Sequence, residues 1–282
     1  GKENAPVIIG GRYGLASKDT TPDMINAIYQ NLAGEAKNPF TVGINDDIKH
    51  TSLEVTEHID VADPTTTELL FFGLGSDGTV GACKNTSKII GDNTDLYSQS
   101  YAAYDSKKSG GSTRLHLRFG KNPIRSTYLV NNPHFVSCST DAYLAKFDMI
   151  DGLRQGGTFL LNTVCPVEEI ENLLPNRYKR ILAQRNAKFY IINANKLAVE
   201  IGLKGKTNTI MQSAFFKLNQ HILPYEKAKE LMKAYAAKTF AKKGQAIIER
   251  NYNAIDGGGD LLVEVPVKPE WALLQDEAAV VD

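Results

Sequence analysis

Cysteine is scarce in this sequence: its 282 residues include three, Cys83, Cys138 and Cys165. They lie far apart, and no C-x-x-C pair occurs. A disulfide framework, a zinc site or an iron–sulfur cluster needs cysteines in larger number or at closer spacing, so the pattern argues against all three. We expect reduced thiols that pack as small apolar side chains.

Net charge is also lacking, because 32 acidic residues balance 32 basic ones. General nucleic-acid binders and membrane-surface binders need a net positive field, so we expect neither kind of partner. No apolar run approaches the ~18 residues of a membrane helix. The chain shows no signal peptide and begins with Gly1 rather than Met. We interpret it as a processed part of a longer, cytoplasmic polypeptide.

Familiar catalytic motifs are missing as well. The sequence has no Ser–His–Asp order, no H-E-x-x-H and no Walker lysine motif, and its five histidines show no ligand spacing. The carboxylate pairs Asp46–Asp47 and Glu168–Glu169 are sequence neighbours, which do not face each other on a helix or a strand. We therefore predict no catalytic residue and no metal ligand.

What the sequence does contain is an alternation of strand-like and helix-like segments. It predicts an α/β layered domain with a mostly parallel or mixed sheet flanked by helices. Strands are expected at residues 68–72, 97–104, 113–119, 158–162, 189–193 and 261–265, and helices at 79–90, 167–174, 195–201 and 225–240.

The linker-like composition of residues 63–67 marks a domain boundary. We assign residues 1–64 to the C-terminal part of a preceding α/β domain, residues 65–276 to the main domain and residues 277–282 to a tail. In the first part, residues 7–15 read as a strand. A helix follows Thr20, and its predicted buried stripe is Ile25, Ile28, Tyr29 and Leu32.

A glycine-rich turn carries the main chemical signal. Residues 73–78 read G-x-G-x-x-G between an apolar strand and a helix, a context in which glycines allow close backbone approach and the helix start attracts phosphate. The candidate phosphate-binding residues are Gly73, Gly75, Ser76, Asp77, Gly78, Thr79 and Lys84. A turn that binds nothing remains an alternative. A nicotinamide dinucleotide is another, since Asp95 and Asp105 could supply the acidic partner.

Basic clusters could serve further phosphate groups. Lys107 and Lys108 lie in a loop of small residues, and Lys206 precedes Asn208 in another. Arg114, His116 and Arg118 alternate with apolar residues and would share one strand face. A ligand with a pyrophosphate and a separate monophosphate needs several such cations around one helix start. Each cluster alone is equally compatible with a solvated surface.

Several stretches, in this order, together resemble one family, the pyruvate:ferredoxin (flavodoxin) oxidoreductases. They are residues 10–18, 40–47, 73–82, 104–110, 117–120, 123–126 and 208–212. The likeness runs from residue 7 to about residue 267. It implies that residues 1 to about 64 end the second domain of such an enzyme and that the rest forms the third, gamma-type domain.

The resemblance implies chemistry for the parent enzyme. Such enzymes decarboxylate pyruvate on thiamine diphosphate, pass electrons through [4Fe-4S] clusters to ferredoxin or flavodoxin, and release acetyl-CoA. The chain resembles none of the segments that hold these cofactors. Its expected partners are the remaining domains or subunits, in a homodimeric parent. We therefore expect the isolated chain to be inactive.

The resemblance also implies that the gamma-type domain helps bind coenzyme A. The glycine-rich turn would meet the nucleotide end, while Lys107 or Lys108, Lys206 and Asn208 would contact phosphates or adenosine. Cys83 departs from the small polar residue expected beside this site. Two alternatives stay open: an architectural domain without a ligand, and an independent nicotinamide dehydrogenase.

Overall fold

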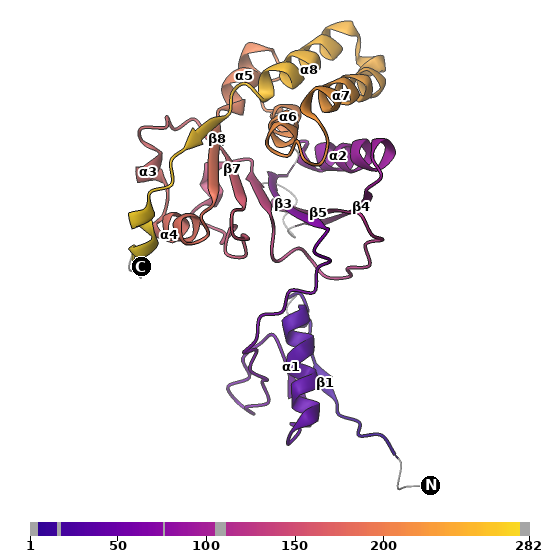
Figure 1. Cartoon of the computed structure of the whole chain (residues 1–282), viewed down its shortest axis with the longest axis vertical. Coiled ribbons are helices and arrows are strands. Elements are labelled where there is room, and N and C mark those ends of the chain that lie inside the picture. Colours follow the sequence, from indigo (N-terminus) through magenta and orange to yellow (C-terminus); the bar gives the residue numbers. More distant parts are fainter. Residues whose placement is uncertain (1–4, 16–17, 76, 105–110, 277–282) are drawn as a thin grey trace. The chain divides into compact units, whose positions relative to one another are not determined.

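The computed structural model describes residues 5–15, 18–75, 77–104 and 111–276. The chain divides into two compact units (Figure 1). The first comprises Gly1–Asp63 and Arg125–Leu129, and the second comprises Pro64–Ile124 and Val130–Asp282. The segment at residues 125–129 thus joins the first unit although it lies far along the sequence.

The first unit is built around helix α1 (Pro22–Ala33). The Thr21 hydroxyl caps this helix by accepting a hydrogen bond from the Met24 amide at 3.3 Å, and Pro22 occupies the first turn. The short strands β1 (Gly11–Arg12) and β2 (Phe40–Thr41) pair in parallel. The predicted strand over residues 7–15 is therefore much shorter than expected.

The predicted buried stripe of this helix is wrong. Ile25, Tyr29 and Leu32 are exposed, and Ala27 is the buried residue of α1. The spacing is helical as predicted, but within the described part of the first unit no packed layer covers these side chains. Periodicity predicts an apolar face and does not by itself supply the surface that buries it.

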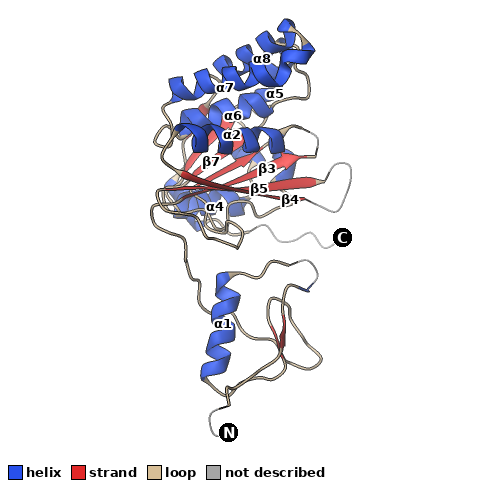
Figure 2. Ribbon diagram, turned by 90° about the vertical axis from the view of Figure 1, so that its right-hand side faces the viewer, coloured by secondary structure: helices blue, strands red, loops and turns tan. Residues whose placement is uncertain are grey.

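The second unit contains a seven-stranded mixed sheet in the order β4-β5-β3-β6-β7-β8-β9 (Figure 2). Strands β3, β6, β7 and β8 are parallel, whereas β5 runs antiparallel to β3 and β4, and β9 runs antiparallel to β8. The predicted α/β fold is confirmed. The strands are β3 (Thr67–Leu74), β4 (Tyr97–Tyr104), β5 (Ser112–Gly120), β6 (Phe135–Cys138), β7 (Thr158–Asn162), β8 (Lys188–Ile192) and β9 (Val263–Val265).

Helices cover both faces of this sheet (Figure 2). On one face lie α2 (Thr79–Asn93), α5 (Ala194–Glu200), α6 (Asn208–Leu218), α7 (Tyr225–Phe240) and α8 (Gln245–Gly258). On the other lie α3 (Ile170–Leu173), α4 (Asn176–Gln184) and the 3₁₀ turns η2 (Asp141–Tyr143) and η4 (Pro269–Leu273). A further turn, η3 (Ala241–Lys243), joins α7 to α8.

Alternation along β3 divides the core into two layers. Leu69 and Phe71 point toward α6, and Leu70 and Phe72 point to the opposite face. Both sets are buried because the strand is covered on both sides, which explains the continuous apolar run in its sequence. Within the part of the chain that the structure describes, none of the helices combines the length and apolar character that a membrane span requires.

Candidate functional site

The glycine-rich turn lies where the chain order of the sheet reverses. After β3 the chain builds β4 and β5 on one side of that strand, and then β6 on its other side. In open α/β sheets, ligands bind outside the carboxyl ends of strands at such a switch point. The turn joining β3 to α2 and the residue after β6, Ser139, therefore occupy the place where a site is expected.

Close packing explains the glycines of this turn. A Cβ atom on Gly73 would lie 2.7 Å from the Cβ of Thr79. Gly78 has a φ of 93°, and a Cβ there would lie 2.7 Å from the Cγ of Asn208. The first glycine lets the helix start approach its own strand, and the last lets the start of α6 approach the start of α2.

Asp77 lies just before Gly78, the N-cap residue of α2, and its carboxylate accepts from the first amide of the helix. Its Oδ1 accepts a hydrogen bond from the Thr79 amide at 2.7 Å, and its Oδ2 accepts one from the Leu74 amide at 2.9 Å. The carboxylate thus occupies the first amide of the helix and neutralises part of its positive end. An anion would have to approach the later amides of the first turn, those of Val80 and Gly81, which have no acceptor inside the helix.

Replacing Asp77 with alanine is expected to destabilise the second unit by about 1 kcal/mol, because the Leu74 and Thr79 amides lose their acceptor. Urea unfolding followed by the fluorescence of Trp271, the single tryptophan, measures this change. Asp95→Ala is the matched control, since Asp95 is exposed and should shift stability by less than about 0.5 kcal/mol. An equal loss in both variants would contradict this role of the Asp77 carboxylate.

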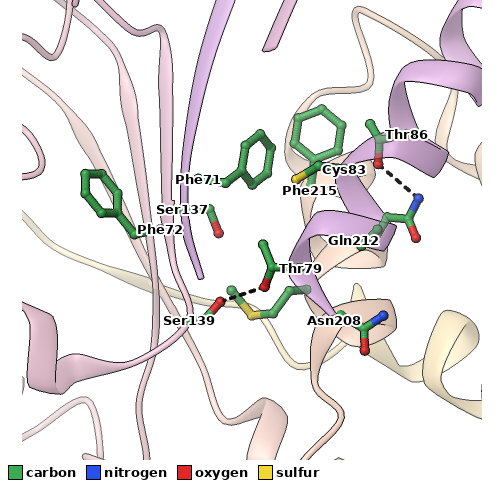
Figure 3. Close-up of a pocket in the computed structure, with 12 residues that line it drawn as sticks. Phe71, Phe72, Thr79, Cys83, Thr86, Ser137, Ser139, Asn208, Gln212 and Phe215 are labelled. Carbon is green, nitrogen blue, oxygen red and sulfur yellow. Dashed lines mark hydrogen bonds between the residues drawn. The ribbon is translucent and has the colours of Figure 1, made fainter. Parts of the chain in front are cut away.

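Beneath the turn lies a small internal cavity of about 20 Å³ (Figure 3). Thr79 and Ser139 meet across it, with their hydroxyl oxygens 3.4 Å apart, and Gln212 donates a hydrogen bond to the Thr86 hydroxyl at 2.9 Å. Cys83 also lines it, and burial, followed by the Asp77 charge, raises the pKa of this thiol. The volume has room for about one water molecule, so no larger ligand fits here.

A larger cavity of about 300 Å³ opens beside the same helix start. Residues of α2, α6, α7 and α8 line it. They are Gly78, Gly81, Ala82, Asn85, Asn208, Thr209, Gln212, Met232, Ala236, Thr239, Phe240, Asn251 and Ile255. This volume is at the lower end of the usual range for small-molecule pockets.

The lining of the larger cavity is neutral. Side-chain amides and hydroxyls alternate with apolar groups such as Met232 and Phe240, and no lining residue is charged. Asn251 is held in place because its Oδ1 accepts from the Thr209 hydroxyl at 3.3 Å and its Nδ2 donates to the Ile247 carbonyl at 2.8 Å. Such a lining suits an uncharged heteroaromatic ring, which offers flat apolar faces and hydrogen-bonding edges.

Cations lie near this cavity without lining it. The Nζ of Lys243 lies 5.5 Å from the ring centroid of Phe240, a lining residue. Lys84 is exposed on α2, one position before the lining residue Asn85. Phosphate groups attached to a ring in the cavity would meet positive charge at its rim.

The structure brings together part of the predicted site. Gly78 and Asn208 line the larger cavity, Thr79 and Asn208 line the smaller one, and Gly73 packs against Thr79. Gly75 lies farther along the turn, where its amide donates to the Gly111 carbonyl at 3.1 Å. Lys84 and Lys206 are exposed and line neither cavity. Ser76, Lys107 and Lys108 lie outside the described residues.

Two of the three residues of the predicted basic strand face do not join this site. His116 and Arg118 are buried within the sheet layer, and Arg118 lies opposite Glu68, at the end of β3 that is remote from the glycine-rich turn. Its guanidinium Nε donates to Glu68 Oε1 at 2.7 Å. The alternation was predicted correctly, but Arg118 is turned to an internal acidic partner rather than to a ligand, and Arg114 is exposed on β5, opposite Phe72.

Sequence reasoning missed the cavity residues of the C-terminal helices. Gln212 and Asn251 are polar residues buried within otherwise apolar helix faces. A polar residue at such a position can be recognised in a sequence and would have indicated a site. Thr239 and Phe240 carried no signal, since their place in the cavity depends on how α7 packs beside α2 and α8.

The described residues contain no group of three or more His, Cys, Asp or Glu side chains that could hold a metal ion. All three cysteines are free, and Cys83 and Cys138 are buried. The three thiols therefore do not form the ligand set of an iron–sulfur cluster.

Comparison with known proteins gives consistent matches. A family model described as pyruvate ferredoxin/flavodoxin oxidoreductase matches residues 68–261. The chain is 48% identical over 274 residues to a pyruvate:ferredoxin oxidoreductase of Moorella thermoacetica, covering 97% of this chain and 23% of that protein. It is 49% identical over 274 residues to a pyruvate-flavodoxin oxidoreductase of Enterobacter agglomerans, covering 96% and 23%. The chain thus spans about a quarter of the length of these relatives.

Solved structures share the fold. The pyruvate oxidoreductase subunit PORC of Thermotoga maritima superposes with a TM-score of 0.57 at 22% identity, covering 71% of this chain and 98% of that one. The 2-oxoglutarate:ferredoxin oxidoreductase of Magnetococcus marinus, solved with 2-oxoglutarate, coenzyme A and succinyl-CoA bound, gives a TM-score of 0.52 at 17% identity, covering 71% and 31%.

Proposed function

The chain belongs to the pyruvate ferredoxin/flavodoxin oxidoreductase family, and on this premise we propose that it is the coenzyme-A-handling part of such an enzyme. The whole enzyme converts pyruvate and coenzyme A to acetyl-CoA and CO2 and reduces ferredoxin or flavodoxin. In this proposal the chain binds the nucleotide end of coenzyme A and supports assembly with the rest of the enzyme.

The neutral cavity of about 300 Å³ between α2 and the three C-terminal helices is the observation that carries this proposal. Its amide and hydroxyl groups suit the edges of adenine, and Met232, Phe240 and Ile255 suit its faces. Coenzyme A was bound in the Magnetococcus marinus enzyme, a distant relative with the same fold, and this supports the choice of nucleotide.

The phosphates would lie at the rim. The Val80 and Gly81 amides of the first turn of α2 point toward the helix start, where the helix dipole favours negative charge. Lys84, next to the lining residue Asn85, and Lys243, whose Nζ lies 5.5 Å from the Phe240 ring centroid, would add cations near the cavity. Asp77 occupies the first amide, so the phosphates would contact α2 slightly farther along than the sequence pattern alone predicts.

The other cofactors implied by the family are assigned to parts of the enzyme beyond these 282 residues. The three cysteines do not fit an iron–sulfur cluster, and the described residues offer no acidic cluster for the metal that would accompany thiamine diphosphate. In this proposal the chain's own role is binding.

A glycine in the cavity wall offers a direct test. A Cβ on Gly81 would meet no atom within 4 Å, and the residue lies in helix α2, where larger side chains are tolerated. Gly81→Leu is expected to fill the cavity and lower the affinity for coenzyme A at least tenfold without lowering the midpoint of thermal unfolding. Isothermal titration calorimetry with coenzyme A measures the change in affinity.

Gly81→Ala is the matched control, because one methyl group leaves most of the volume open. We expect it to retain affinity within about threefold and to raise stability slightly, as alanine replaces glycine in a helix. If the unsubstituted chain gives no heat with millimolar coenzyme A, the ligand role fails and an architectural role is favoured. Equal affinities for all three proteins would place the ligand elsewhere.

A further inference from the structure

Strand β4 forms one edge of the seven-stranded sheet. It pairs with β5 along its whole length, from Tyr97 opposite Gly120 to Tyr104 opposite Thr113. Among the described residues no other strand pairs with it. Alternate amide and carbonyl groups of β4 therefore face away from the sheet, in a position to pair with an added strand.

The usual features that protect an edge strand are absent from β4. It contains no charged residue, no proline and no glycine, and its register with β5 is uninterrupted by a bulge. Tyr97, Tyr101 and Tyr104 are 50%, 58% and 64% exposed. The opposite edge strand, β9, is different: it is three residues long and includes Glu264. The sheet is thus protected at one edge and open at the other.

The sequence of β4 indicates what pairs with it. Residues 97–101 read Tyr-Ser-Gln-Ser-Tyr, which is the same in both directions about Gln99. Antiparallel pairing of two copies about a two-fold axis at Gln99 places Tyr97 opposite Tyr101 of the second copy and Ser98 opposite Ser100. Residues of the same parity share a sheet face, so each pair also lies on one face.

These cross-strand pairs are favourable. Aromatic pairs and hydroxyl pairs each contribute roughly 0.2–1 kcal/mol relative to alanine pairs, and no like charges meet. The next pair outward would join Leu96 to Ala102, both of which pack on the apolar layer beneath α2. The residues of the two copies of β4 therefore match in register, in the sheet face that they occupy and in polarity.

We propose that β4 is a self-association edge, on which a second copy of this chain adds its own β4 antiparallel and continues the sheet across a two-fold axis at Gln99. With the axis at Gln99, the strand residues paired in both copies are 97–101, a ribbon of five residues that is well below the ~1,600 Å² of a standard stable interface. Association of the 282-residue chain is therefore weak and depends on concentration.

Sedimentation of the chain over a range of concentrations tests the proposal, with a monomer–dimer equilibrium as the expected result. Ser98→Lys is expected to weaken the dimer at least tenfold, because it brings charge and long side chains to the paired edge. Val263→Lys, on the opposite edge strand, is the matched control and should leave the equilibrium unchanged. A chain that stays monomeric, or a dimer weakened only by Val263→Lys, overturns the proposal.

Cross-linking tests the register. Cys165 is replaced by serine in every sample, because it is the native thiol that is not fully buried. A mixture of Ser98→Cys and Ser100→Cys chains is expected to form disulfide-linked dimers on mild oxidation, since these positions face each other in the proposed pairing. Either variant alone should cross-link much less. Equal yields in all three samples would contradict the two-fold axis at Gln99.

Discussion

Replacing Glu68 with glutamine is expected to destabilise the second unit by about 3–5 kcal/mol. Glu68 is 2% exposed at the start of β3, and its carboxylate accepts hydrogen bonds from Arg118 Nε at 2.7 Å and Arg154 Nη2 at 3.0 Å. Arg118 is itself 3% exposed. Without the carboxylate, a buried guanidinium loses its countercharge, and the low-dielectric surroundings make that loss large.

The measurement is urea unfolding followed by Trp271 fluorescence, which reports on the second unit because Trp271 is buried in its core. Glu230→Gln is the matched control. Glu230 forms an exposed ion pair with Lys227, and exposed pairs contribute at most about 1 kcal/mol. A loss below about 1 kcal/mol for Glu68→Gln would show that the buried network does not stabilise the fold as argued.

A double replacement separates the cost of leaving Arg118 unpaired from the net contribution of the Glu68–Arg118 ion pair to stability. Glu68→Gln combined with Arg118→Met removes the two fully buried charges and leaves the half-buried Arg154, so we expect it to be less destabilising than the sum of the single changes. This buried pair also explains why the sequence suggested that Arg118 could bind phosphate. An arginine on an alternating strand gives the same sequence pattern whether it faces a phosphate or an internal carboxylate.

Local patterns predicted the strands of the sheet well. The apolar run of β3, the alternation of β5 and the helix start at Thr79 each depend on neighbouring residues, and the structure has all three elements. Strand β6 was missed because its four residues, Phe135–Cys138, are too few to show a period. Helix α6 lacked the signature of an amphipathic helix, since residues 210–216 are buried on every side.

The candidate site could be predicted only in part, for a physical reason. The turn that shapes one wall is local, so its glycines and Thr79 were identified from the sequence. The other walls come from α6, α7 and α8, whose cavity-lining residues lie far from the turn along the chain. Their approach depends on the packing of whole helices, such as Asn208 against Gly78, which no short pattern encodes.

His116 makes stability depend on pH. Burial, followed by the charges of Arg114 and Arg118, lowers the pKa of His116 to about 4. Its Nδ1 accepts a hydrogen bond from the Val130 amide at 3.1 Å, which requires a neutral ring. The Nε2 atom is buried without a hydrogen-bonding partner in the described structure. Burial and the two arginine charges therefore outweigh what favours protonation of the ring.

The direction of the effect follows from proton binding. An unfolded chain binds a proton at His116 near the ordinary value of 6.5, whereas the folded chain does so only near pH 4. Between these values the unfolded state binds more protons, so stability is full above about pH 6.5 and falls as the pH is lowered. With these two pKa values, proton linkage lowers the free energy of unfolding by about 2 kcal/mol between pH 8 and pH 5.

Unfolding in urea at pH 8 and at pH 5 measures this loss, and both pH values lie above the range in which most carboxylates titrate. His116→Gln keeps a hydrogen-bond acceptor for the Val130 amide but cannot take up the proton, so its stability should change about 2 kcal/mol less over this range. His116→Leu should lose the same pH dependence while also lowering stability at pH 8, because the Val130 amide loses its acceptor. If both variants retain the full pH dependence, other groups are responsible for it and the buried neutral imidazole is not the cause.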